Sequence, residues 1–496
     1  MVDFLKINAA DNVAVALVAL PAGRRLEVDG VGLTLRADIP MGHKFALTPL
    51  SVGQHVLKYG YPIGHAVAPV EAGGWVNEQN IKTNLEGLLS YAYSPTRSEA
   101  CYANRNLSFR GYRRANGEVG VRNEIWIVPT VGCVNGIATE LAERLRREAD
   151  MSHIDAVVAF PHNYGCSQLG DDHENTRKIL RNMALHPNAG AVLVLGLGCE
   201  NNQPDAFKEF LGSSYDSQRV QFLVAQKVDD EYEEGMKILR KLHHLAAADR
   251  RTDIPLSELR VGLKCGGSDG LSGITANPLL GAFSDFLAAQ GGTSVLTEVP
   301  EMFGAETILM NRCATPDIFD KTVQLINDFK DYFVRNRQPI YENPSPGNKA
   351  GGISTLEEKS LGCTQKSGTS EVTDVLMYGE RLTHRGLNLL SAPGNDLVAA
   401  TALGAAGCQL VLFTTGRGTP FGSFVPTVKI STNTPLARSK PRWIDFNAGT
   451  IVEGESLSEA AERFIAYIIA IASGERVNTE LKNFREIAIF KTGVTL

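Results

Sequence analysis

The chain has 496 residues, 43% of them hydrophobic and 21% charged, which is the composition of a folded protein with more than one domain. Its 49 basic and 55 acidic residues give a net charge of −6, and this argues against a nucleic-acid partner. No secretion signal or apolar run of membrane-spanning length is recognisable, and eight cysteines are too few for a disulfide scaffold. We therefore expect a cytoplasmic protein with reduced thiols and no membrane partner.

The first predicted unit is a small all-β domain at residues 1–80. Short strand-like runs, such as Val13–Leu20, alternate with Gly, Pro and Asp turns. One of these turns, at Gly42, presents His43 and Lys44 side by side. Two interpretations stay open: exposed polar residues on a hairpin, or a base and an anion contact delivered from this domain onto another.

Residues 81–110 lack apolar periodicity and predict a linker. Residues 111–250 then predict a middle α/β domain, because short apolar runs at 125–130, 156–161 and 191–197 alternate with helical stretches. Each run leads into a polar turn that carries a cysteine. The carboxyl ends of parallel strands are where ligands bind, and this edge would carry His162 with Cys133, Cys166 and Cys199.

Residues 251–496 predict a second parallel-sheet α/β domain. A strand at 259–264 leads to Cys265 and a glycine-rich loop, and Asn277-Pro278 is expected to start a helix. Glycine-rich backbone at a helix N-terminus binds anions. The spacing fits neither the dinucleotide fingerprint nor the phosphate loop, so we expect a cradle for a carboxylate or sugar acid; a tight structural turn is the alternative. The cradle would use Gly266, Ser268, Asp269 and Asn277.

Three further loops carry polar side chains that suit a sugar acid. Glu298 and Glu301 follow a predicted strand and could serve as a base or hard metal ligands, or simply pair with lysine. Asn348 and Lys349 lie on a Pro-Gly turn, and Arg417 lies between two glycines. A lysine and an arginine at one sheet edge suit carboxylate recognition.

The cysteines predict a soft metal site. They lack the Cys-x-x-Cys spacing of structural zinc, so the local sequence gives little support for that metal. Thiolates with an imidazole suit iron or zinc. One ferrous ion and an iron–sulfur cluster with an exchangeable iron both stay open, as does a nucleophilic cysteine, although no Cys–His–Asn order supports the last. The expected ligands are Cys133, Cys166 and Cys199, with Cys265 and Glu298 as alternates.

Several long motifs closely resemble those of the altronate/galactarate dehydratase family. The likeness covers nearly the whole chain and extends to its final residues, 484–496. The motifs are Gly42–Lys44, Tyr112–Glu124, His162–Cys166, Gly196–Glu200, Cys265–Asp269, Pro344–Lys349 and Thr414–Pro420.

The resemblance implies a β-clip (SAF-like) N-terminal domain, a linker, a middle domain used in homodimer contact and a Rossmann-like C-terminal domain. It also implies loss of water from D-altronate to give 2-dehydro-3-deoxy-D-gluconate, with Fe²⁺ or Mn²⁺ as cofactor. A sulfolactate-cleaving lyase is similar in sequence. A related reaction on galactarate or another 2-hydroxy acid is therefore the alternative.

Proton removal beside a carboxylate requires a base and a means of stabilising the added negative charge. We expect iron at the three middle-domain cysteines, His43, His162 and Lys349 as candidate catalytic groups, and Lys44 and Arg417 among the substrate contacts. A nicotinamide-dependent dehydrogenase is disfavoured by the missing fingerprint. A non-enzymatic sugar-acid sensor is the other alternative. Such a protein would bind its ligand but form no 2-keto acid.

Overall fold

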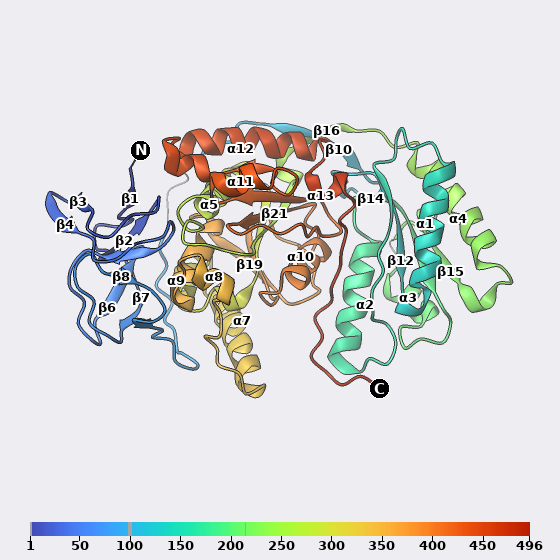
Figure 1. Cartoon of the computed structure of the whole chain (residues 1–496). Helices are drawn as coiled ribbons and strands as arrows, with labels where there is room; N and C mark the ends of the chain where they lie inside the picture. Colours follow the sequence, from blue (N-terminus) through green and yellow to red (C-terminus); the bar gives the residue numbers. More distant parts are fainter. Residues whose placement is uncertain (1, 98–101, 214) are drawn as a thin grey trace.

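The computed structural model describes residues 2–97, 102–213 and 215–496, so positions 98–101 of the expected linker lie outside the described residues. Figure 1 shows three units in a row, with the C-terminal domain between the N-terminal and middle domains. Tyr91 and Tyr93 fix the linker on the central domain through hydrogen bonds to Glu306 and to the Cys313 carbonyl. Within the described residues, none of the helices combines the length and apolar character needed to cross a bilayer.

The N-terminal domain is built from short strands, as expected from its turn residues. Its core includes Val56 and Ile63, and the same apolar cluster takes in Ala305 and Leu361 of the C-terminal domain. The two domains are therefore joined by a shared core. The strands are β1 (Phe4–Leu5), β2 (Val13–Ala16), β3 (Arg25–Val28), β4 (Val31–Thr34), β5 (Lys44–Ala46), β6 (His55–Lys58), β7 (Tyr61–Ala66), β8 (Trp75–Val76) and β9 (Ile81–Lys82).

The middle domain contains a four-stranded parallel sheet in the order β13-β12-β14-β15. Alternate residues of β12 face opposite sides: Ile125 and Ile127 pack with α1 and α4, whereas Trp126 and Val128 pack with α2 and the C-terminal domain. The elements are β12 (Glu124–Pro129), α1 (Asn135–Glu148), β13 (Ala156–Ala159), α2 (Gly170–Ala184), β14 (Ala189–Gly196), α3 (Pro204–Phe210), β15 (Val220–Val224) and α4 (Glu231–Ala246).

The C-terminal domain has a seven-stranded parallel sheet in the order β19-β20-β18-β17-β21-β22-β23. The strand order reverses between β17 and β21, and such a switch point opens a crevice at the carboxyl ends of the strands. The strands are β17 (Arg260–Cys265), β18 (Thr293–Leu296), β19 (Val372–Leu376), β20 (Gly386–Leu390), β21 (Leu410–Thr415), β22 (Thr427–Ser431) and β23 (Phe446–Asn447). The α/β body predicted from the sequence is confirmed.

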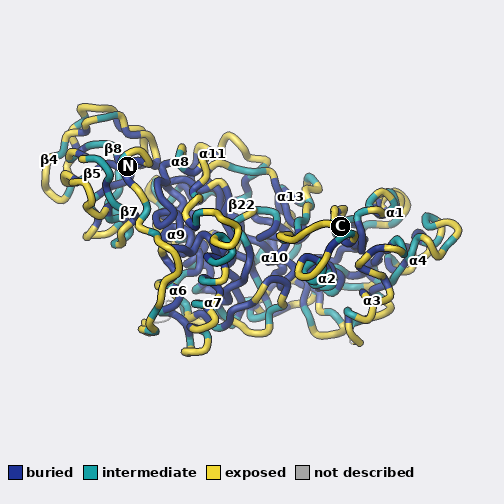
Figure 2. The backbone as a smooth tube through the Cα atoms, turned by 90° about the horizontal axis from the view of Figure 1, so that it is seen from below, coloured by how far each residue is buried: buried dark blue, intermediate teal, exposed yellow. Residues whose placement is uncertain are grey.

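Helices cover both faces of this sheet, and buried residues concentrate in the central domain (Figure 2). A small sheet of β10 (Ser108–Arg113), β11 (Val119–Gly120) and β16 (Thr252–Pro255) forms where the chain enters and leaves the middle domain. The helices are α5 (Ala276–Ala289), α6 (Glu306–Met310), α7 (Pro316–Arg335), α8 (Pro346–Ala350), α9 (Leu356–Thr364), α10 (Asp396–Ala405), α11 (Thr434–Ser439), α12 (Leu457–Ala472) and α13 (Asn478–Leu481).

The N-terminal domain meets the central domain by close backbone contact at Gly352. A Cβ atom there would lie 2.3 Å from the Gly42 carbonyl oxygen, and the φ of +100° is unfavourable for other residues.

We therefore expect Gly352→Ala to cost on the order of 1–3 kcal/mol in backbone strain and to loosen domain docking. Faster proteolysis of the linker would report the loosening. Gly347→Ala is the matched control, because a Cβ there meets nothing within 4 Å. Equal linker cleavage in both variants would contradict the expectation.

Candidate active site

A cavity of about 630 Å³ opens at the carboxyl edge of the C-terminal sheet. Its wall is formed by the end of β17 and the following glycines, 265–267, together with the segment 342–349 and the turn 394–396 before α10. Glu301 and Lys359 complete the lining. The glycine loop after β17, which the sequence predicted to follow a strand end, therefore borders a cavity.

The floor of this cavity carries a compact group of two thiols and a carboxylate. Cys265 Sγ lies 3.1 Å from Glu301 Oε2, and Cys363 Sγ lies 3.2 Å from the same oxygen. The two sulfur atoms are 3.3 Å apart. β17 supplies Cys265, a 3₁₀ turn (Val299–Glu301) supplies Glu301 and α9 supplies Cys363, so three separate elements build the group.

Three buried lysines surround this group. Lys359 Nζ lies 2.8 Å from Glu301 Oε1, and Lys366 Nζ lies 2.9 Å from Cys265 Sγ. Lys264 bridges Glu298 and Asp396 at 2.9 and 2.7 Å. Because each ammonium group faces a carboxylate or sulfur atom, the charges compensate one another inside the protein.

Electrostatics in this cluster keep the carboxylate charged and the second thiol protonated. Burial by itself would raise the pKa of Glu301, but Lys359 and Lys366 outweigh it and hold that pKa at about 2. The hydrogen bond to Cys265 and burial raise the pKa of Cys363 well above its ordinary value. In the absence of other ligands, Cys363 is therefore a neutral thiol beside an ionised carboxylate.

Two cations remain available around the cavity. Lys349 lines it and is half-buried, and Arg417 is exposed with its Cβ against the backbone of Gly267. Within the described residues, neither side chain has an ion-pair or hydrogen-bond partner. Asp396 also lines the cavity; its Oδ1 is held by Lys264, whereas its Oδ2 has no partner in the described part of the chain.

Other predicted cradle residues serve the structure of the loop. Asp269 accepts hydrogen bonds from Ser272, Thr432 and Asn433. Asn348 closes the first turn of α8 and donates to the Ser268 carbonyl. Of these residues, Gly266 and Asn348 line the main cavity, and the buried Ser268 hydroxyl has no partner among the described residues.

The prediction that Asn277 caps the start of a helix is wrong. α5 begins at Ala276, so Asn277 lies inside the helix. Its side chain donates to the Gly362 carbonyl and accepts from the Thr414 hydroxyl, which ties α5 to α9 and β21. These buried contacts favour a structural role over an anion contact.

His43 and Lys44 are both buried, so the interpretation as an exposed hairpin is wrong. Lys44 Nζ donates to the Gly352 carbonyl, the Ser354 hydroxyl and the Glu358 carboxylate, which uses all three of its protons. Its expected contact with substrate is therefore replaced by a contact between domains.

The His43 ring is also fully engaged. Trp75 donates to Nδ1 at 3.2 Å, and Nε2 lies 3.2 Å from the Ala350 carbonyl oxygen. Burial lowers the pKa of His43, which favours a neutral ring. His43 is not among the residues that line the cavity, so the geometry favours a role in positioning α8.

The three middle-domain cysteines lie exposed on neighbouring loops. Gly132 N–H donates to the Tyr164 carbonyl, and Asn202 N–H donates to the Gly165 carbonyl, so hydrogen bonds connect the loops. We call the loops 130–135, 162–168 and 197–203 the cysteine platform. His162 stabilises it: Nε2 contacts the Pro129 carbonyl at 2.8 Å, Nδ1 accepts from Tyr164 N–H, and burial lowers its pKa.

The structure corrects the expected compact iron site on this platform. Within the described ranges, the set of three His, Cys or acidic ligand atoms lying within 4.8 Å of one another is Cys265, Glu301 and Cys363. The strand ends bring Cys133, Cys166 and Cys199 to the same edge, but each is exposed on its own loop. Cys265, an alternate in the sequence prediction, belongs to the compact group, and Glu298 lies just behind it.

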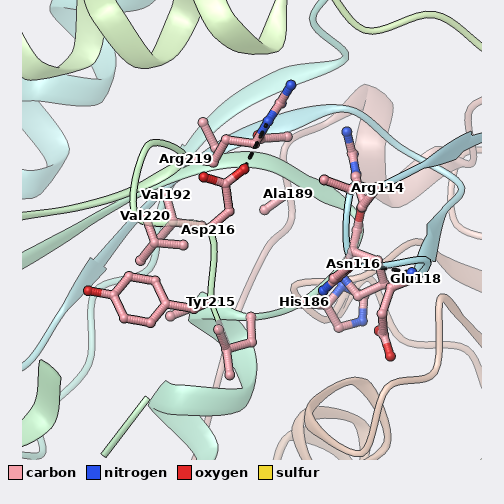
Figure 3. A pocket seen from close by; sticks show the side chains of 16 residues that line it. Arg114, Asn116, Glu118, His186, Ala189, Val192, Tyr215, Asp216, Arg219 and Val220 are labelled. Carbon is pink, nitrogen blue, oxygen red and sulfur yellow. Dashed lines mark hydrogen bonds and ion pairs between the residues drawn. The ribbon is translucent and has the colours of Figure 1, made fainter. Parts of the chain in front are cut away.

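A second cavity, of about 280 Å³, lies at the amino ends of β14 and β15 (Figure 3). Arg114 and Arg219 line it, and both pair with Asp249 at 2.7–2.8 Å. Arginines near the buried His186 help burial lower its pKa to about 3. Its arginines are paired and it lies opposite the carboxyl edge, so we favour the first cavity as the active site.

The sequence prediction overlooked Cys363, Lys359 and Lys366. Lys359 and Cys363 are four residues apart, which places them on one face of a helix, and this spacing was the available signal. All nine residues of α9 are buried, including Glu357, Glu358 and Lys359. A helix buried on every side gives no amphipathic pattern, so its polar residues did not stand out.

Comparisons with known proteins cover the chain from end to end. Family models described as the altronate/galactarate dehydratase SAF domain, the D-galactarate dehydratase/altronate hydrolase second domain and the D-galactarate/altronate dehydratase C-terminal domain match residues 2–84, 111–247 and 256–495. The chain is 60% identical to an altronate dehydratase of Bacillus subtilis and 57% identical to that of Escherichia coli, over 100% of each chain. A galactarate dehydratase (L-threo-forming) of Escherichia coli is 35% identical over 95% of this chain and 93% of its own.

Proposed function

This chain belongs to the altronate/galactarate dehydratase family, and we propose that it converts D-altronate into 2-dehydro-3-deoxy-D-gluconate by removing water. The resemblance predicted from the sequence is confirmed, and the protein is a hydro-lyase. Relatives named altronate dehydratase are 57–60% identical, against 35% for the one named galactarate dehydratase, and this difference favours altronate as the substrate. The dehydrogenase and sensor alternatives do not fit this family.

The cavity at the end of β17 is the observation that supports this chemistry. An aldonic acid carries one carboxylate and several hydroxyl groups, so it needs a cation and a set of polar contacts. Among the residues that the structure describes, Arg417 and Lys349 have no ionic partner, and Asp396 has one carboxylate oxygen without a partner. Lys349 and Asp396 line one cavity with room for a six-carbon acid, and Arg417 lies beside Gly267 in its wall.

The positions of these residues suggest a separate role for each of them during dehydration. Arg417 holds the substrate carboxylate, and Asp396 Oδ2 accepts the proton from the adjacent carbon. Lys349 donates a proton to the departing 3-hydroxyl, which leaves as water, and the remaining enol becomes the 2-keto product. Lys264, paired with Asp396 Oδ1, keeps this carboxylate oriented.

The resemblance implies Fe²⁺ or Mn²⁺ as cofactor, and the donors on the cavity floor fit the first better. Two thiols and one carboxylate suit iron, whereas manganese favours oxygen ligands. When bound there, a divalent ion supplies positive charge that stabilises the negative charge developing on the substrate. Cys265, Glu301 and Cys363 would hold it.

An iron–sulfur cluster on Cys133, Cys166 and Cys199 is a second cofactor proposal. Its support is the cysteine platform, because cluster thiolates bind separate iron atoms and can lie farther apart than the ligands of one ion. Anaerobic reconstitution with ferrous iron and sulfide should then give sulfide-containing protein, and Cys166→Ser should not. Equal sulfide content in both would exclude the cluster.

The homodimer and the sugar-acid partner implied by the resemblance are also proposals. Light scattering of the purified protein tests the first.

Substrate identity is tested by anaerobic incubation with ferrous iron and either D-altronate, galactarate or sulfolactate. We expect D-altronate to give the fastest formation of a 2-keto-3-deoxy acid, measured with a carbonyl reagent. Faster turnover of galactarate would assign the chain to the other branch of the family. If none of the three substrates gave a keto acid, the proposal would be contradicted.

A further inference from the structure

The thiol pair on the cavity floor carries an inference about metal binding. We infer that Cys265, Cys363 and Glu301 bind one divalent ion of the iron–zinc class, and that this ion displaces both thiol protons. The inference deepens the proposed function, on which it rests for the use of the ion in catalysis. Binding itself requires only these three side chains.

Charge balance is the first argument. The lysines 264, 359 and 366 are matched by three carboxylates, those of Glu298, Glu301 and Asp396. Both thiols donate a hydrogen bond to Glu301 Oε2. One M²⁺ that replaces two S–H protons leaves the buried charge unchanged. Because uncompensated charge inside a protein is costly, the cluster selects a divalent ion.

Ligand geometry is the second argument. With metal–sulfur bonds of about 2.3 Å, two ligand atoms of a tetrahedral site lie about 3.7 Å apart. The three distances here are 3.1, 3.2 and 3.3 Å, so each must open by roughly half an ångström, which small side-chain rotations provide.

Access from solvent is the third argument. Cys265 and Glu301 line the cavity, whereas Cys363 does not. An ion held by these three side chains would therefore be reachable from the cavity. Three protein ligands with one open position is the arrangement of a catalytic site, and a structural site would be closed by a fourth.

The neighbouring lysines orient the ligands. Lys359 contacts Glu301 Oε1, while both sulfur atoms contact Oε2, so one carboxylate oxygen is fixed and the other is directed at the thiols. Lys366 donates to Cys265 Sγ at 2.9 Å and would stabilise its thiolate. Partners of this kind hold metal ligands in place in many metalloproteins.

The test is an anaerobic titration of the full-length protein with Co²⁺. We expect one ion per chain, thiolate-to-cobalt charge-transfer absorption and release of two protons, measured by calorimetry in buffers of different ionisation enthalpy. Cys265→Ser and Cys363→Ser should lose the absorption, and Glu301→Gln should weaken binding at least tenfold. Cys313→Ser is the matched control and should bind as the wild type does, because Cys313 is a buried thiol that contacts the Leu309 carbonyl and Thr322 and lies outside this group.

Charge-transfer absorption that persists in Cys265→Ser and Cys363→Ser, or disappears in Cys313→Ser, would overturn the inference. If either serine variant fails to fold by circular dichroism, Glu301→Gln and the proton count still decide it. Keto-acid formation from D-altronate is measured separately. Cobalt bound here without turnover contradicts the proposed function alone, and turnover with cobalt bound elsewhere contradicts this inference alone.

Discussion

Glu358→Ala is expected to lower the free energy of unfolding by about 3–5 kcal/mol, because it leaves two buried ammonium groups without their counter-charge. Glu358 pairs with Lys44 at 2.9 Å and with Lys58 at 2.8 Å, and all three side chains are at most 1% exposed. The lysines belong to the N-terminal domain and Glu358 to α9 of the C-terminal domain. Denaturant unfolding and linker proteolysis should therefore both report the loss.

Two controls separate this effect from a general loss of ion pairs. Glu462→Ala removes the exposed pair with Arg105 and should cost no more than about 1 kcal/mol. Lys44→Met removes one of the two lysines and leaves the Lys58–Glu358 pair intact, so it should cost less than Glu358→Ala. A loss in Glu462→Ala as large as that in Glu358→Ala would contradict the expectation.

The ionisation of the Glu358 carboxyl predicts how the free energy of unfolding depends on pH. Burial by itself would raise the pKa of Glu358, but Lys44 and Lys58 outweigh it and hold the pKa at about 2, below the ordinary 4.5. A depressed carboxyl pKa stabilises the folded state above the unfolded pKa, and that stability is lost as pH falls from 4.5 toward 2. In Glu358→Gln, the fall in unfolding free energy over this range should be smaller.

One carboxylate cannot compensate both lysines equally. Burial lowers the pKa of Lys44 despite Glu358, whereas for Lys58 the attraction of Glu358 outweighs burial and the pKa rises. Lys44→Met leaves Lys58 paired with Glu358 at 2.8 Å, whereas Glu358→Ala leaves both ammonium groups without a carboxylate. This difference is the physical reason for expecting Lys44→Met to be the milder substitution.

Asp396→Asn is expected to lower kcat on D-altronate by about 10²–10⁴-fold, the usual contribution of a general base. The amide keeps the shape of the side chain but cannot accept the substrate proton. KM should change little, because the carboxylate contact is assigned to Arg417.

Glu342→Gln is the matched control, since Glu342 is an exposed carboxylate that lines the same cavity. It should retain wild-type turnover. Exchange of the substrate α-proton with deuterated solvent gives an independent readout and should vanish in Asp396→Asn. A variant with near-normal turnover would show that another group takes the proton.

Local sequence patterns were enough to predict the architecture of the chain. Apolar runs ending in glycine marked the strands, helical stretches between them required parallel pairing, and the turn-rich start indicated a β domain. The same rule placed Cys265, Gly266 and Lys349 near one sheet edge, where the structure has its cavity. It also placed Cys133, Cys166 and Cys199 on neighbouring loops, although it could not say whether their sulfur atoms meet.

These patterns could not predict which distant residues pair with the buried charged groups. Cys363 is 98 residues from Cys265, and Glu358 is 314 residues from Lys44. α9, which carries both Cys363 and Glu358, is buried on all sides and so has no amphipathic signature.

By itself, the sequence determined the order of strands and helices, the domain types and the family of this protein, since these depend on neighbouring residues and on long shared motifs. Tertiary packing alone decided that Lys44 holds two domains together and that Cys265 meets Cys363 and Glu301. Pairing of buried charged and thiol groups depends on which distant segments exclude water together, and that is a property of the folded chain.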